Sequence, residues 1–150
     1  MSAERTLEEM LRRDGFLVYK TRGVSMRPLL KENRDLVTIR PFDGRLKKYD
    51  VPLYRRRGNR YTLHRIIAVR ENDYVIRGDN TFAKEYVPDI AVIGVLTGIR
   101  RKGKDIDLSG AGYRFYTRFW NLIYPVRFVL HKARRLGGRI KRGLKGGKNK

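Results

Sequence analysis

Short runs rich in Val, Ile, Leu and Tyr alternate with turn residues through most of this chain. Runs of this length, bounded by Gly, Asn, Asp and charged residues, are typical of β-strands joined by short connections. The predicted strands are Phe16–Lys20, Asp35–Arg40, Asp50–Arg56, Tyr61–Arg70, Tyr74–Arg77, Ile90–Arg101 and Asp105–Leu108. The pattern therefore predicts a mostly β domain, with a hairpin turn at residues 101–104 joining its last two strands.

Helical patterns flank these strands on both sides. Near the N-terminus, Thr6 and Glu9 have the spacing of a capping box, and Gly15 is a stop signal, so we expect a short helix between them. After the last strand, aromatic and aliphatic residues are interleaved with arginines, which predicts a basic aromatic helix with a kink at Pro125.

The chain becomes almost purely Gly, Lys and Arg beyond Leu136, a composition that buries too little apolar surface to offset the entropy of ordering. We therefore expect a β domain over residues 1–108, a basic aromatic helical segment over 109–136 and a disordered basic tail over 137–150. A chain of 150 residues has room for one such domain with a core of its own.

The net charge of +21 is concentrated at the C-terminal end. Residues 109–150 contain 12 Lys and Arg and no Asp or Glu. The first residues are too polar for a signal peptide, and the apolar run Phe119–Leu130 is shorter than the ~20 residues that span a bilayer. We expect a cytoplasmic protein that does not cross a membrane. Cysteine is absent, which excludes disulfides and thiolate metal sites.

Three separated motifs contain the groups that serine-based acyl transfer needs. Ser25 lies in Gly-Val-Ser-Met-Arg-Pro, His64 in Leu-His-Arg-Ile, and Asp79 in Arg-Gly-Asp-Asn. A serine hydroxyl needs a base within hydrogen-bond reach, and that base is often oriented by a carboxylate. We therefore predict Ser25 as the nucleophile, His64 as the general base and Asp79 as its partner.

Strand pairing offers a geometric reason for grouping His64 with Asp79. Residues 71–73 have the composition of a tight turn, so the strands on either side should form an antiparallel hairpin. With a two-residue loop between Arg70 and Asp73, His64 would face Asp79, and directly opposed Cβ atoms lie roughly 5 Å apart. Ser25, placed where Gly23 permits a sharp turn, would be exposed next to free backbone amides that could bind an oxyanion.

The order Ser-Met-x-Pro, Asp-Val-x-x-Tyr at residues 50–54, His-Arg-Ile and Gly-Asp-Asn resembles the type I signal peptidase family. The likeness is strongest to the archaeal and endoplasmic-reticulum type, in which histidine replaces the lysine base, and it covers about residues 20–100. It implies a signal-peptidase-like β-fold, shared with SOS-type repressors, a nucleophile at Ser25 and a base at His64. The family also has a second acid after Gly-Asp-Asn, for which this chain offers Glu85 or Asp89.

The expected function is a serine endopeptidase that needs no metal or organic cofactor and cleaves a peptide or protein near the inner membrane face. This chain would lack the transmembrane anchor that precedes the serine in signal peptidases. The alternative is a catalytically silent binding module of the same fold.

Residues 109–150 leave three possibilities for partners: docking on an anionic membrane, packing on the β domain, and binding nucleic acid. Nucleic acid ranks third, because no helix-turn-helix, zinc module or RNA-binding aromatic motif is present.

Overall fold

The computed structural model describes residues 6–146, with side chains up to residue 138. Its strands are β1 (Leu17–Lys20), β2 (Asp35–Arg40), β3 (Pro52–Arg56), β4 (Arg60–Leu63), β5 (Arg65–Val69), β6 (Asp73–Arg77), β7 (Glu85–Pro88), β8 (Val92–Arg101) and β9 (Lys104–Ile106). Its helices are α1 (Leu7–Asp14), the short 3₁₀ helix η1 (Asp89–Ala91), α2 (Ala111–Leu122) and α3 (Tyr124–Gly146). The chain is mostly β up to residue 108, as the sequence predicts, and it divides into two units after Arg114.

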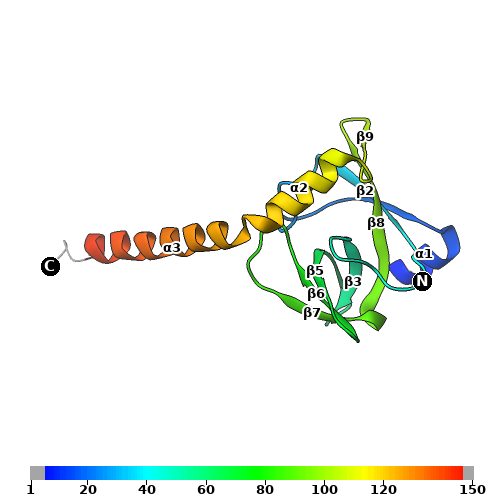
Figure 1. The fold of residues 1–150 in the computed structure, drawn as a ribbon, viewed down its shortest axis with the longest axis horizontal. Coiled ribbons are helices and arrows are strands. Elements are labelled where there is room, and N and C mark those ends of the chain that lie inside the picture. The colour runs from blue at the N-terminus through cyan, green and yellow to red at the C-terminus, as the bar shows by residue number, and fades with distance from the viewer. Residues whose placement is uncertain (1–5, 147–150) are drawn as a thin grey trace, which may run out of the picture. The chain divides into compact units, whose positions relative to one another are not determined.

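Two antiparallel sheets make up the first unit. The larger sheet has the strand order β1-β2-β8-β3-β4, with β9 added alongside β8, and the smaller sheet has the order β5-β6-β7 (Figure 1). Strands β1 and β4 are the two ends of the main strand order, so their outer edges are unpaired within the sheet. The long strand β8 pairs with both β2 and β3, which makes it the centre of the larger sheet.

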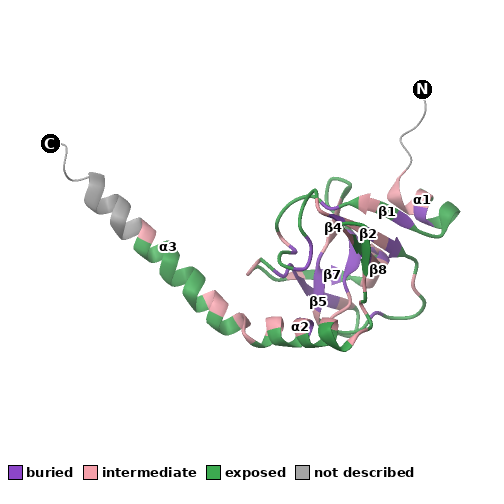
Figure 2. Cartoon of the chain, turned by 90° about the horizontal axis from the view of Figure 1, so that it is seen from above, coloured by how far each residue is buried: buried purple, intermediate pink, exposed green. Residues whose placement is uncertain are grey.

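The main hydrophobic cluster joins the two sheets. Tyr54 of β3 and Val92 of β8 pack with Ile66, Ile76 and Val87 of the smaller sheet, and all five are buried. Figure 2 shows the same distribution, with buried positions (purple) gathered in the strands. Burial alternates along β2 and the first half of β8, which places one face of the larger sheet in the core, whereas β6 is buried at four consecutive positions.

Two local predictions are confirmed by the described residues. The Thr6 side chain accepts a hydrogen bond from the Glu9 backbone in a complete capping box, and Gly15 ends α1 with a left-handed φ of 72°. At the other end of the unit, Arg101 pairs with Lys104 across a two-residue turn in which both central residues have positive φ.

The predicted strand Tyr61–Arg70 is wrong as a single element. The structure divides it at His64 into β4, which pairs with β3 in the larger sheet, and β5, which pairs with β6 in the smaller sheet. The chain changes sheets at this residue, and His64 therefore lies at the junction between them. A run of alternating residues carries no local signal for such a change.

The second unit contains most of α2 and all of α3. The two helices are separated at Ile123, close to the predicted kink at Pro125. The structure continues α3 to Gly146, across residues 137–146 for which the sequence predicts disorder, and residues 147–150 lie outside the described part. Lys and Arg are good helix formers, and propagation of an existing helix is easier than its nucleation, so two adjacent glycines do not end α3. None of the helices in the described chain is long and apolar enough for a membrane span.

Candidate active site

Ser25 lies on the connection between β1 and β2, and we call the first part of that connection, residues 21–30, the serine loop. Gly23 turns the loop with a φ of 82°, a conformation that favours glycine. Met26, Leu29 and Leu30 are buried and anchor the loop to the domain, while Ser25 itself remains partly exposed. The sequence therefore presents a serine hydroxyl on a loop whose following residues are fixed by packing.

His64 is held at one ring nitrogen by two side chains. Its Nδ1 lies 3.2 Å from Oε1 of Glu85 on β7 and 3.2 Å from the hydroxyl of Tyr54 on β3. His64 is only 7% exposed, and Glu85 is close enough to the Tyr54 hydroxyl to raise its pKa. A carboxylate at Nδ1 favours the tautomer in which Nε2 is an unprotonated base.

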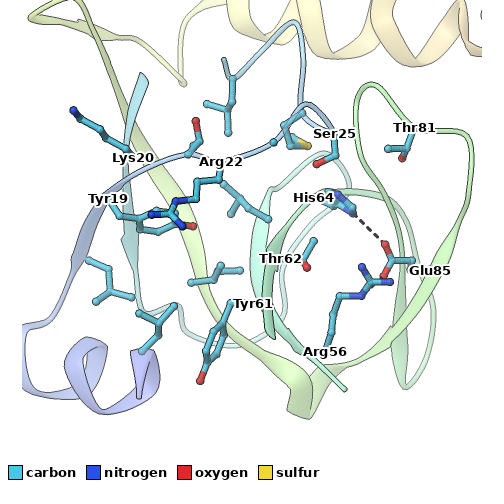
Figure 3. Close-up of a pocket in the computed structure, with 18 of the residues that line it drawn as sticks. Tyr19, Lys20, Arg22, Ser25, Arg56, Tyr61, Thr62, His64, Thr81 and Glu85 are labelled. Carbon is cyan, nitrogen blue, oxygen red and sulfur yellow. Dashed lines mark ion pairs between the residues drawn. The ribbon is translucent and has the colours of Figure 1, made fainter. Parts of the chain in front are cut away.

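The other ring nitrogen of His64 faces the serine loop. A Cβ atom placed on Gly78 would lie 3.1 Å from His64 Nε2 and 2.6 Å from the backbone oxygen of Ser25. Figure 3 shows the Ser25 side chain next to the His64 ring, with Glu85 on the far side of that ring. The structure therefore brings together two of the three predicted catalytic residues, Ser25 and His64.

Asp79 has a different partner from the one predicted. Its two carboxylate oxygens accept hydrogen bonds from Arg65 Nε at 2.7 Å and Arg65 Nη2 at 2.8 Å, and both side chains are almost fully buried. Arg65 also donates to the backbone oxygen of Tyr49 and to the hydroxyl of Tyr113. The prediction that Asp79 orients His64 Nδ1 is corrected, because Glu85 occupies that position.

A β-bulge is the physical reason for this error. The turn forms as expected, with the Arg70 N–H donating to Asp73, but the register shifts by one residue between Ile66 and Ala68. Arg65 therefore pairs with Arg77, and His64 no longer faces Asp79 across the hairpin. Bulges of this kind are common beside functional sites, where they redirect a side chain.

The Gly-Asp-Asn motif instead supports the serine loop. The Asn80 N–H donates to the backbone oxygen of Ser25 at 2.7 Å, and the Asn80 side chain donates to the oxygen of Val24 at 3.2 Å. Gly78 allows the close approach, because a side chain there would collide with Ser25. The buried Asp79 of the same motif forms an ion pair with Arg65. The motif therefore connects the serine loop, through Asn80, to β5, through Asp79.

Asp89, the other acidic candidate, lies on η1 and pairs with Arg45 at 3.0 Å. Both side chains of that pair are more than 40% exposed, as in an ordinary surface ion pair. Of the acids that the family resemblance offered, only Glu85 is in contact with His64. The short strand β7 that carries Glu85 was not among the predicted strands.

Burial lowers the pKa of His64 below the ordinary value of 6.5, and Glu85 opposes part of this shift by attracting the protonated ring. The pKa of Tyr54 is raised, first by burial and then by the neighbouring Glu85 charge, so its hydroxyl stays protonated. His64 is therefore neutral near pH 7, the state that a general base requires.

An open cleft of about 1190 Å³ leads to Ser25 and His64. Residues of β1 line one side and residues of β4 line the other, so the unpaired outer strands of the larger sheet border the same space. Figure 3 shows Lys20 and Arg22 on the β1 side and Thr62 on the opposite side. Arg56 also lines the cleft and pairs with Glu85 at 3.2 Å.

Among the described residues, no group of three or more His, Asp or Glu side chains has the arrangement of a metal site. The cleft is lined by both a serine hydroxyl and a histidine ring. Comparison with known proteins finds no matching family model and no matching curated protein.

Proposed function

We propose that this chain is a serine endopeptidase of the signal-peptidase-like class, with Ser25 as nucleophile, His64 as general base and Glu85 as the residue that orients His64. The observation that carries the proposal is the placement of His64, whose Nδ1 contacts Glu85 while Nε2 faces the serine loop. The ordered motifs around Ser25, His64 and Gly78-Asp79-Asn80 support the same class.

The reaction begins as the Ser25 hydroxyl oxygen attacks a peptide carbonyl carbon and its proton passes to His64 Nε2. The carbonyl oxygen becomes an oxyanion, which the backbone N–H of Ser25 and neighbouring amides stabilise. The tetrahedral intermediate collapses as His64 returns the proton to the leaving amine, and an acyl ester remains on Ser25. A water molecule, deprotonated by His64, then hydrolyses the ester and frees the serine.

Glu85 and Tyr54 have distinct parts in this scheme. The Glu85 carboxylate accepts the Nδ1–H of His64 and stabilises the imidazolium that forms during attack. The Tyr54 hydroxyl contacts both partners and is buried, so it limits the ring positions open to His64. Asp79 acts only indirectly, as a positioning residue, because its carboxylate is occupied by Arg65.

The substrate class follows from the cleft. Two unpaired strand edges border it, and such edges bind extended peptides through backbone hydrogen bonds. Its volume of about 1190 Å³ and its open shape suit an extended segment of a polypeptide better than a small molecule, which would be enclosed on most sides. The proposed substrate is therefore a protein or peptide that is extended at the cleavage site.

A serine-directed covalent probe tests the proposal. The wild-type chain should be labelled, the Ser25→Ala variant should not, and a Ser109→Ala variant should be labelled like the wild type. Ser109 is the matched control because it is an exposed serine whose hydroxyl donates to Asp107, far along the chain from the site. His64→Ala should fold and show greatly reduced labelling.

Equal labelling of Ser25→Ala and wild type would contradict the assignment of the nucleophile. No labelling and no peptide cleavage by any form would contradict the peptidase proposal, and would favour a silent binding module of the same fold.

A further inference from the structure

Exposed apolar side chains form a continuous row along the C-terminal helices. Their exposed fractions lie between 45% and 77%. The residues are Phe115, Phe119, Leu122, Val126, Val129, Leu130 and Leu136. At 100° per residue they fall within an arc of about 120° around a helix axis. Single exposed apolar residues are ordinary, but a continuous row of seven marks an interaction surface.

The row continues across the break between α2 and α3. The Ile123 N–H donates to the Phe119 oxygen at 3.0 Å, and the Arg127 N–H donates to the Ile123 oxygen at 3.1 Å. These helical hydrogen bonds keep the two helices in phase, so their apolar residues stay on one side. Residues 115–136 cover about 33 Å at 1.5 Å per residue.

The large aromatic residues of the opposite side are engaged within the helices themselves. Tyr116 stacks on Trp120 at 6.1 Å between ring centroids, and Tyr124 stacks on Phe128 at 6.0 Å. The guanidinium of Arg127 lies 3.8 Å from the centroid of the Trp120 ring. The exposed row lies on the other side of the helices, and its own Phe115 and Phe119 stack on each other at 5.7 Å between ring centroids.

Cationic residues border the exposed row. By the same projection, Arg118 and Lys132 lie along one edge and Arg134 along the other, and all three are exposed. Residues 109–150 contain 12 Lys and Arg and no Asp or Glu. An apolar strip between cations matches the boundary of an anionic bilayer, where acyl chains meet negatively charged headgroups.

We propose that residues 115–136 form an interfacial helix that docks on an anionic lipid bilayer, with the apolar row inserted and the flanking cations at the headgroups. Nucleic acid would match the charge but leave the apolar row in water. A second copy of the chain would cover the row but bring two wholly basic segments together. The proposal does not depend on the peptidase activity.

Vesicle sedimentation of the full-length chain tests this docking. Vesicles of phosphatidylcholine alone are compared with vesicles of equal parts phosphatidylcholine and phosphatidylserine. The wild type should bind the anionic vesicles, and a Val126→Gln, Val129→Gln, Leu130→Gln triple variant should bind them at least about tenfold more weakly. His131→Gln is the matched control, because it replaces an exposed residue of α3 outside the arc, and it should bind like the wild type.

Two further variants separate the contributions. Leu122→Gln changes the most exposed residue of the row, so it should weaken binding several-fold without disturbing the fold. A Lys132→Gln, Arg134→Gln double variant should bind anionic vesicles about thirtyfold more weakly and change little on phosphatidylcholine. Ser25→Ala should bind vesicles like the wild type.

Three results would overturn the proposal. The first is equal binding of the wild type to both kinds of vesicle. The second is undiminished binding by the triple variant and by Leu122→Gln. The third is a dimer, seen by analytical ultracentrifugation without vesicles, that the triple variant abolishes, since the row would then be covered by a second copy.

Discussion

The corrected roles of Asp79 and Glu85 lead to opposite effects of the same chemical change, replacement of a carboxylate by an amide. Asp79→Asn should mainly reduce stability, because the Arg65 side chain is only 1% exposed and would lose its charged partner. Glu85→Gln should mainly reduce activity, because the Glu85 side chain is 23% exposed and contacts the proposed base.

The size of the Asp79 effect follows from its contacts. Removing one partner from a buried ion pair costs about 3–5 kcal/mol, because the remaining charge stays buried. Arg65 would keep its hydrogen bonds to Tyr49 and Tyr113, so the lower end applies, about 3 kcal/mol. For a unit of this size, that loss should lower the melting temperature by roughly 10–15 °C.

Glu85→Gln should have a small effect on stability and a large effect on activity. Its second ionic partner, Arg56, is 48% exposed, so Glu85→Gln should lower the free energy of unfolding by less than about 1 kcal/mol. Loss of the carboxylate at Nδ1 removes both the tautomer preference and the stabilisation of the imidazolium. We expect kcat/KM to fall by about 10²–10³, because Tyr54 still contacts the ring.

Urea unfolding followed by circular dichroism measures the free energy of unfolding of both variants, and peptide cleavage measures their kcat/KM. A cost below about 1 kcal/mol for Asp79→Asn, together with the same loss of activity as in Glu85→Gln, would contradict these two roles. That result would return Asp79 to the role of direct partner of His64.

Three further predictions concern the same site. The acid limb of the kcat/KM profile should have its midpoint below 6.5, because burial lowers the pKa of His64 and keeps the base neutral; a midpoint above 6.5 would contradict this. Gly78→Ala should reduce cleavage at least about tenfold, because its Cβ would lie 2.6 Å from the backbone oxygen of Ser25 and displace the serine loop; wild-type kinetics would show that the loop position is unimportant. Tyr54→Phe should keep the fold and lower kcat more than it raises KM, by roughly tenfold, because His64 loses one of two contacts at Nδ1; a change in KM alone would place Tyr54 in substrate binding.

Local signals explain which parts of this structure were predictable from sequence. The capping residues Thr6 and Glu9, the stop at Gly15 and the turn at residues 101–104 act within a few residues of themselves, and all formed as expected. The mostly β character also follows from alternation that is visible in short windows.

The parts that were missed depend on contacts between distant segments. The change of sheet at His64 and the bulge before Ala68 are set by the packing of β5 on β6, which no nearby Gly or Pro announces. Glu85 reaches His64 only because β7 adds to the far edge of the smaller sheet. Glu85 was therefore identifiable from the sequence as a candidate. Choosing it over Asp79 required the register of the strands in three dimensions.

The most direct test of the central claim is cleavage of a mixed-sequence peptide library, read by mass spectrometry, with the wild type and Ser25→Ala compared at equal concentration. We expect new peptide termini with the wild type and none above background with Ser25→Ala, while the two proteins show the same unfolding transition. The same new termini from Ser25→Ala would contradict the assignment of Ser25 as the nucleophile.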